Sequence, residues 1–262
     1  MPKPKALILR AAGVNCDMES AYAAELAGFA AERVHVNRLA SGEVNLDDYR
    51  FLFIPGGFSY GDDVAAGKIM ALELRTRLRD ALFRFEEQGK LVLGVCNGFQ
   101  ILIKTGLMPF RFDRPDDMRA TLTNNDSGKY EDRWVYLKTE PDTACVFTRN
   151  MKPVIQLPVA HGEGKFLVES PADMHELEGH GQIVLRYVAK DGGEPSYPED
   201  PNGSIGHVAG VCNRTGTIFG LMPHPERFLR RINHPRWTRE DLPEEGDGVA
   251  FFRNAYEYCR GI

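Results

Sequence analysis

The sequence lacks the features that mark membrane-spanning and disulfide-stabilised proteins. None of its apolar runs approaches the ~20 residues needed to cross a bilayer. Its five cysteines are odd in number, scattered and without C-x-x-C spacing. The first apolar stretch, residues 6–9, stops at Arg10, so it is too short for the core of a signal peptide. We therefore expect a cytoplasmic protein with no membrane partner.

Several ligand-binding signatures are also missing. No G-x-G-x-x-G follows the first apolar run to form a dinucleotide site, and no G-x-x-x-x-G-K-[ST] is present to hold the phosphates of ATP. The seven histidines include no H-x-x-x-H pair, and Cys96 has no second thiol near it in sequence. The formal net charge of −5 makes nucleic acid an unfavourable partner. We expect no cofactor and no metal in this chain.

The chain does contain a regular alternation of apolar runs and helix-forming segments. Its 262 residues, 43% apolar and 26% charged, are enough for one large α/β domain spanning residues 1–262. The strand cores are apolar without alternation, which predicts an open, mostly parallel sheet with helices on both faces. The predicted strands are 6–9, 32–37, 49–57 and 91–96, and the predicted helices are 19–29, 68–89 and 97–106. The first helix is expected to bury a stripe formed by Tyr22, Leu26 and Phe29.

After residue 106 the pattern changes to an added antiparallel portion in the C-terminal half. The segments 134–140, 154–168 and 183–188 are predicted antiparallel strands. A Pro-, Gly- and acid-rich segment, 191–204, is predicted to be a surface loop. Another buried strand, 217–226, runs into a turn bracketed by prolines, and 248–259 is a predicted closing helix.

Four unusual loops are expected to converge on one edge of this sheet. In open parallel sheets, ligands bind at the carboxyl ends of the strands. The loops at that edge contain Asn15-Cys16-Asp17, Gly56-Gly57-Phe58, Cys96-Asn97-Gly98 and Pro223-His224-Pro225-Glu226. Their convergence predicts the functional site there.

The G-x-C-x-G pattern around Cys96 has the form of a nucleophile elbow. Small residues, Gly94 and Gly98, flank the cysteine where a sharp strand-to-helix turn requires them. The following helix would point its N-terminus at the thiol and favour the thiolate. A small apolar cysteine that caps a core strand is the alternative interpretation.

His224 and Glu226 supply the base and the orienting group that a thiol nucleophile needs. Two residues apart in extended chain, their side chains would project to the same side, so the carboxylate could fix the imidazole tautomer. The alternative is a turn histidine beside a solvated glutamate. Gly57, at the end of its strand, could turn a backbone N–H inward as an oxyanion donor, or form a plain turn.

These segments together carry a resemblance to a known family. The stretches IPGGFSYGDD, LGVCNGFQIL, AHGEGKF and LMPHPER resemble the class I (triad) glutamine amidotransferases, which have a flavodoxin-like fold. Among these they are most similar to the glutaminase subunits and domains of phosphoribosylformylglycinamidine synthase, and the similarity covers nearly the whole chain.

The resemblance implies a role for each matching residue. Cys96 would attack the side-chain amide of glutamine, His224 would move the protons, and Glu226 would hold the imidazole. The backbone N–H groups of Gly57 and Asn97 would bind the oxyanion.

Three further residues are implied to bind substrate: Gly56, Phe58 and Gln100. A helix-surface glutamine is the alternative for Gln100. His161 and Glu163 match the motif, but no chemical step is assigned to them.

The resemblance also implies a partner. The ammonia would pass to a synthetase subunit, which would hold ATP and Mg and convert formylglycinamide ribonucleotide to formylglycinamidine ribonucleotide in purine biosynthesis. A small accessory subunit would be a further component of that complex. The segments 107–153 and 191–204 are either partner surface or tolerated insertions. A partner-independent cysteine hydrolase of γ-glutamyl or peptide bonds, and a non-catalytic module on the same fold, are the alternatives. For Cys16, on the same edge, we expect only packing at a helix start.

Overall fold

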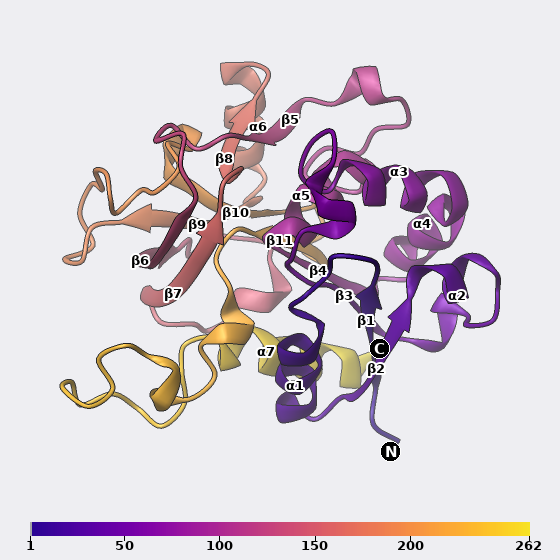
Figure 1. Ribbon diagram of the computed structural model, residues 1–262, viewed down its shortest axis with the longest axis horizontal. Coiled ribbons are helices and arrows are strands. Elements are labelled where there is room, and N and C mark those ends of the chain that lie inside the picture. Colours follow the sequence, from indigo (N-terminus) through magenta and orange to yellow (C-terminus); the bar gives the residue numbers. More distant parts are fainter. Residues whose placement is uncertain (1) are drawn as a thin grey trace.

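Two apolar runs that are buried over their whole length form the centre of the structure. They are β3 (Phe51–Ile54) and β4 (Leu91–Val95), which pair in parallel. A strand with both faces buried is expected where helices cover both sides of a parallel sheet. The computed structural model describes residues 2–262 and is shown in Figure 1.

Within those residues the strands form a nine-stranded sheet of order β2-β1-β3-β4-β11-β10-β9-β6-β7 and a separate β5-β8 ladder. The first five strands of that order run parallel and the remaining pairs are antiparallel. The further strands are β1 (Lys5–Arg10), β2 (Ala30–His35), β5 (Ala120–Thr123), β6 (Glu131–Thr139), β7 (Val154–His161), β8 (Lys165–Val168), β9 (Ile183–Val188), β10 (Val208–Cys212) and β11 (Ile218–Leu221).

Helices cover both faces of the parallel half, as Figure 1 shows. On one face α1 contacts α7, and on the other α3 contacts α5. The helices are α1 (Asp17–Ala27), α2 (Val36–Ala40), α3 (Lys68–Arg77), α4 (Arg79–Glu87), α5 (Asn97–Thr105), α6 (Pro171–Gly179) and α7 (Val249–Gly261). Short 3-10 turns are η1 (Leu46–Asp48), η2 (Ser59–Asp62), η3 (Pro115–Asp117), η4 (Val146–Thr148), η5 (Ile205–His207), η6 (Pro225–Arg227) and η7 (Arg231–Asn233). The predicted α/β class, with its antiparallel C-terminal portion, is confirmed.

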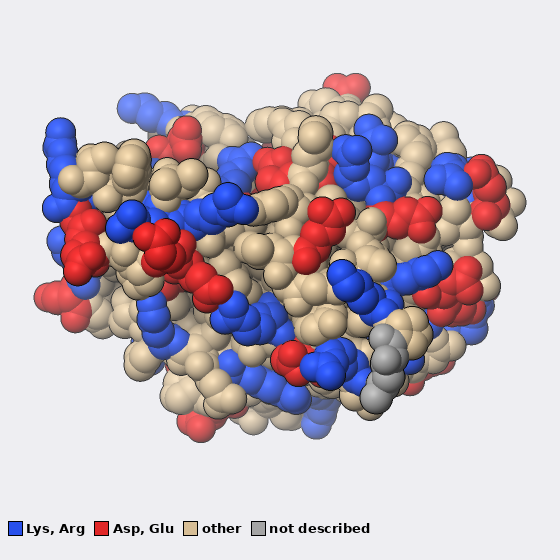
Figure 2. Space-filling model, turned by 90° about the horizontal axis from the view of Figure 1, so that it is seen from below, with Lys and Arg blue, Asp and Glu red and all other residues tan. Residues whose placement is uncertain are grey.

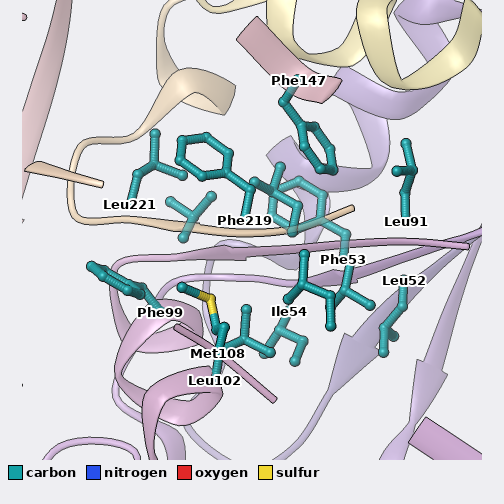
Figure 3. Close-up of a cluster of buried hydrophobic side chains, with 14 of the residues drawn as sticks. Leu52, Phe53, Ile54, Leu91, Phe99, Leu102, Met108, Phe147, Phe219 and Leu221 are labelled. Carbon is teal, nitrogen blue, oxygen red and sulfur yellow. The ribbon is translucent and has the colours of Figure 1, made fainter. Parts of the chain in front are cut away.

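The core lies on both sides of the parallel strands. Figure 3 shows Phe147 and Phe219 on one side, toward α7, and Phe99, Leu102 and Met108 on the other, around α5. All five side chains are at most 1% exposed. Burying a side chain of this size contributes roughly 1.5–3 kcal/mol, so the packing of α5 against the sheet fixes the start of that helix.

Two predicted elements are each divided in the structure. The helix predicted for residues 68–89 is two helices, α3 and α4, because Leu78 has a non-helical backbone with φ −129° and ψ 6°. The strand predicted for 154–168 turns after His161, and its second part, β8, leaves the large sheet to pair with β5.

The apolar stripe predicted for the first helix is also wrong. Tyr22 and Leu26 are 38% and 45% exposed, whereas Ala23 and Ala24 are buried. Because the helix packs closely against its neighbours, small residues occupy the buried face. Phe29 is buried, but it lies beyond the end of α1.

The segment 191–204 is not only a surface loop. Asn202 is fully buried, and its Nδ2 donates to the carbonyl oxygen of Gly164 (2.9 Å) and to the Tyr187 hydroxyl (3.1 Å). Polar groups can be buried when they are hydrogen-bonded in this way.

The elements α2, α6, β5 and β10 were not predicted. The single domain over residues 1–262 stays a prediction. No helix within residues 2–262 is long and apolar enough to span a membrane.

Charges of both signs are interspersed on the molecular face seen from below. Figure 2 shows Lys and Arg side chains beside Asp and Glu side chains across that face. In the structure as a whole, many surface charges are paired, such as Arg253 with Glu245 at 2.7 Å. Exposed pairs contribute little to stability.

Candidate active site

The backbone at Cys96 has a strained conformation. This residue lies between the end of β4 and the start of α5, with φ 52° and ψ −108°. A positive φ is uncommon for residues other than glycine and costs about 1–3 kcal/mol. The two flanking glycines have no room for a side chain: a Cβ on Gly94 would lie 2.6 Å from the Gly98 carbonyl oxygen, and one on Gly98 would lie 1.9 Å from the Ile54 oxygen. The structure thus has the elbow geometry that the spacing predicted.

His224 and Glu226 form a buried ion pair. Nδ1 of His224 lies 2.6 Å from Oε1 of Glu226, and the two side chains are 2% and 0% exposed. Their chain is not extended as predicted, because Glu226 lies in the 3-10 turn η6. Burial lowers the pKa of His224, but the Glu226 carboxylate and the Cys96 sulfur outweigh it and hold that pKa well above its usual value.

The structure brings Cys96 and His224 together. Gly56 lies between them: a Cβ at Gly56 would be 2.7 Å from Cε1 of His224 and 3.5 Å from Cβ of Cys96. Strand β7 contacts both residues, because the Ala160 carbonyl lies 3.5 Å from the Cys96 sulfur and the Pro158 carbonyl accepts the His224 N–H at 2.8 Å. Nε2 of His224 is buried, and no atom of residues 2–262 forms a hydrogen bond with it. It is therefore available for proton transfer.

A small cavity of about 130 Å³ opens beside the Cys96 sulfur. The other residues that line it come from the loop after β3, from α5, from the β5–β6 loop, and from the end of β7 with the turn after it: Gly57, Phe58, Asp62, Ala66, Gln100, Tyr130, Ala160, His161, Gly162 and Glu163. The predicted residues Gly57, Phe58 and Gln100 therefore share one cavity with Cys96. Gly56 and Asn97 are not part of its lining.

The two predicted oxyanion donors lie at chain turns. Gly57 has φ 142°, and a Cβ there would be 2.7 Å from the backbone nitrogen of Asn15, so only glycine fits. Asn97 is the first residue of α5, where backbone N–H groups have no intrahelical acceptor and the helix dipole favours negative charge. Both positions suit the stabilisation of a developing oxyanion.

Side-chain amides connect α5 to the loops around the cavity. The Asn97 Nδ2 donates to Asp62 (3.0 Å) and to Oε1 of Gln100 (2.9 Å), and its Oδ1 accepts the Ser59 N–H at 3.2 Å. Gln100 in turn donates to the carbonyl oxygen of Glu163 at 2.5 Å. Gln100 is 3% exposed, so the helix-surface alternative is wrong.

Asp62 and Tyr130 line the cavity, but no role was predicted for either residue. Asp62 has φ 54°, and burial raises the pKa of its carboxyl group. Tyr130 is exposed, and its ring centroid lies 6.3 Å from that of Phe58. The acidic GDD run signalled Asp62 weakly, whereas no pattern marks Tyr130, which is separated from Cys96 by the whole of α5 and β5.

Cys16 lies closer to the histidine than the expected packing role requires. Its sulfur is 3.0 Å from Nη2 of Arg227, and it is 1% exposed. Ligand atoms of Cys16, His224 and Glu226 all lie within 4.8 Å of one another, a spacing that a metal ion could bridge. Nδ1 of His224 and Oε1 of Glu226 already bond to each other at 2.6 Å, and the cationic guanidinium of Arg227 lies beside the Cys16 sulfur, so the donor set does not favour a second cation. Unlike Cys96, Cys16 has an ordinary φ of −95°.

Comparison with known proteins shows the family of the chain. Residues 3–259 match the family model described as the CobB/CobQ-like glutamine amidotransferase domain. The chain is 47% identical over its whole length to the phosphoribosylformylglycinamidine synthase subunit PurQ of Dehalococcoides mccartyi, all of which is covered. It is 40% identical to the subunit of the same name from Methanococcus maripaludis, over 97% of each chain.

A solved structure is also similar to this chain over nearly its whole length. A chain from the structure of PurLQS from Thermotoga maritima matches with a TM-score of 0.75 and 32% identity, over 98% of this chain and 99% of that one. The chain therefore belongs to the family of CobB/CobQ-like glutamine amidotransferase domains that includes the phosphoribosylformylglycinamidine synthase subunit PurQ.

Proposed function

We propose that the protein hydrolyses glutamine to glutamate and ammonia with the triad Cys96, His224 and Glu226. The ammonia passes to a synthetase partner that converts formylglycinamide ribonucleotide to formylglycinamidine ribonucleotide with ATP. The observation that carries the proposal is the strained Cys96 elbow beside the buried His224–Glu226 pair, at the wall of one cavity. Family membership and the names of the relatives support the pathway.

In the first half of the reaction, the Cys96 thiolate adds to the γ-amide carbon. The carbonyl oxygen becomes an oxyanion, which accepts N–H bonds from Gly57 and Asn97. The carbon–nitrogen bond then breaks, His224 gives its proton to the departing nitrogen, and ammonia leaves a glutamyl thioester. The high pKa of His224 suits this step, because the imidazole holds the proton that the departing nitrogen takes.

In the second half, water hydrolyses the thioester. Neutral His224 takes a proton from the water, the hydroxide adds to the thioester carbon, and the carbon–sulfur bond breaks. The proton returns to the Cys96–His224 pair, and glutamate is released. Glu226 keeps Nδ1 of His224 protonated, so that Nε2 performs both transfers.

The synthetase step belongs to a partner chain. The sequence contains no P-loop motif, so ATP and Mg are assigned to the synthetase, with a small accessory subunit as a further component. The Thermotoga maritima structure, described as PurLQS, supports this assembly. We also place the protein in the cytoplasm, which five free cysteines support.

Single-cysteine variants test the nucleophile. Cys96→Ala should lower glutamate release by at least ~1,000-fold, and Cys16→Ala should leave Cys96 reactive. Both are measured in the presence of the synthetase, its ribonucleotide and ATP. An active Cys96→Ala protein, together with an inactive Cys16→Ala protein, would overturn the assignment.

A further inference from the structure

His161, the last residue of β7, is a polar residue of the cavity for which the triad mechanism gives no role. It is 2% exposed and lines the same 130 Å³ cavity as Cys96. The residue before it, Ala160, contacts the Cys96 sulfur through its carbonyl oxygen at 3.5 Å. His161 and Cys96 therefore share the wall of one cavity.

The hydrogen bonds of Asn125 determine the tautomer of His161. The Asn125 Nδ2 donates to two carbonyl oxygens, those of Lys129 (3.0 Å) and His161 (2.8 Å), which fixes the orientation of the amide. Its Oδ1 accepts the Gly164 N–H at 3.0 Å and lies 3.1 Å from Nδ1 of His161. Because Oδ1 is only an acceptor, Nδ1 must carry the hydrogen. Nε2 is therefore unprotonated.

This Nε2 is a buried acceptor with no partner. It is inaccessible to solvent, and no atom of residues 2–262 forms a hydrogen bond with it. Burial lowers the pKa of His161 to about 3, so the ring stays neutral near pH 7. The ring cannot turn away, because it packs on Gly164, where an added Cβ would be 2.3 Å from Cε1. An unsatisfied buried acceptor is costly, and a ligand N–H would satisfy it.

We propose that Nε2 of His161 accepts an N–H of the glutamine γ-amide and thereby selects an amide over a carboxylate. This inference rests on the proposed glutaminase function. An amide nitrogen offers two donors, whereas the carboxylate of glutamate offers only lone pairs, which the Nε2 lone pair repels. His161 takes no proton in the reaction. It binds the nitrogen that leaves, and His224 remains the proton donor.

Two substitutions separate the acceptor from the fold. His161→Asn keeps a donor to Asn125 but has no acceptor at the Nε2 position, and His161→Gln places an amide oxygen there. In the reconstituted complex, His161→Asn should lower kcat/KM for glutamine about 10- to 100-fold, and His161→Gln should recover most of that loss. The exposed His175→Asn serves as the matched control.

A probe without amide hydrogens makes the test specific. A glutamine-like diazoketone alkylates the nucleophile but has no γ-N–H, so its rate of reaction with Cys96 should stay within about 3-fold of wild type in His161→Asn. Equal losses of hydrolysis and labelling, or no loss of hydrolysis, would overturn the inference. If the wild-type complex neither releases glutamate nor becomes labelled at Cys96, the proposed function itself fails.

A spectroscopic measurement needs no change at His161. In Cys96→Ala protein labelled with ¹⁵N-histidine, the Nε2 resonance of His161 should be that of an unprotonated nitrogen, and it should move upfield with glutamine but not with glutamate. A protonated Nε2 in the free protein would contradict the inference.

Discussion

Two buried cysteines lie at the same edge of the sheet, and the conformation of each backbone distinguishes them. Cys96 has φ 52°, which close packing of Gly94 and Gly98 imposes, while Cys16 has φ −95° at the start of α1. Strain at a single residue persists only where surrounding structure over-determines it. The motif around Cys96 predicted this difference, because the flanking glycines are visible in the sequence. The contact between Cys16 and Arg227 was not predictable, since 211 positions separate the two residues.

Gly56 offers a test of the Cys96–His224 geometry at the residue scale. Gly56→Ala would place a Cβ 2.7 Å from Cε1 of His224, and the ring must move. A displacement of about 1 Å costs on the order of 100-fold in rate. We expect kcat for glutamate release to fall by about that factor in steady-state assays. The control is Gly179→Ala, whose Cβ meets nothing within 4 Å; equal activities of the two variants would contradict the geometry.

The neutral state of His161 predicts a pH-dependent stability. The folded-state pKa is about 3, against ~6.5 when unfolded. Below pH 6.5 the unfolded chain binds a proton that the folded chain does not, so this contribution is complete above pH 6.5 and is lost as the pH falls toward 3. Between pH 7.5 and 5, wild type should lose about 2 kcal/mol more unfolding free energy than His161→Gln. Urea unfolding measures this, with the exposed His175→Gln as control; equal losses in wild type and His161→Gln would refute it.

At the scale of elements, the sequence predicted long apolar strands and the helices after them, but not their interruptions. The apolar runs and the glycines in the sequence predicted the positions of β3, β4 and α5. The break at Leu78 and the departure of β8 from the main sheet depend on tertiary packing, which overrides local propensity. Asp62 and Tyr130 were missed for the same reason: the segments that line the cavity meet only in the folded chain.

The contact between α5 and β3 should control both stability and activity. Gly98→Ala would put a Cβ 1.9 Å from the Ile54 carbonyl oxygen, a backbone atom that cannot turn aside. The start of α5, which positions Cys96, must then shift. We expect a loss of about 1–3 kcal/mol in chemical denaturation together with loss of glutaminase activity. The exposed helix-end control, Gly261→Ala, should change neither; an active and fully stable Gly98→Ala protein would be inconsistent with the elbow.

At the scale of the whole molecule, the four segments that resemble the glutamine amidotransferases together predicted the family and its partner. No single motif among them would have predicted both. Cavity, triad and loops come from segments spread between residues 57 and 226. The cavity is small and lined in part by the side chains of Phe58 and Tyr130, which are 44% and 52% exposed.

Coupling to the synthetase is the corresponding prediction. The isolated chain should release glutamate slowly, and addition of the synthetase with ribonucleotide and ATP should raise kcat/KM by at least ~10-fold, since closure of such a site on its partner completes the catalytic geometry. A coupled glutamate assay with and without the partner measures this. Equal rates would favour a partner-independent hydrolase.

The most direct test of the account is the position of the covalent adduct. The wild-type complex is treated with a glutamine-like diazoketone, digested and analysed by mass spectrometry. The account predicts one modified peptide, carrying the adduct on the sulfur of Cys96, and no adduct when His224→Ala removes the base. An adduct on Cys16, or undiminished labelling of His224→Ala protein, would contradict it.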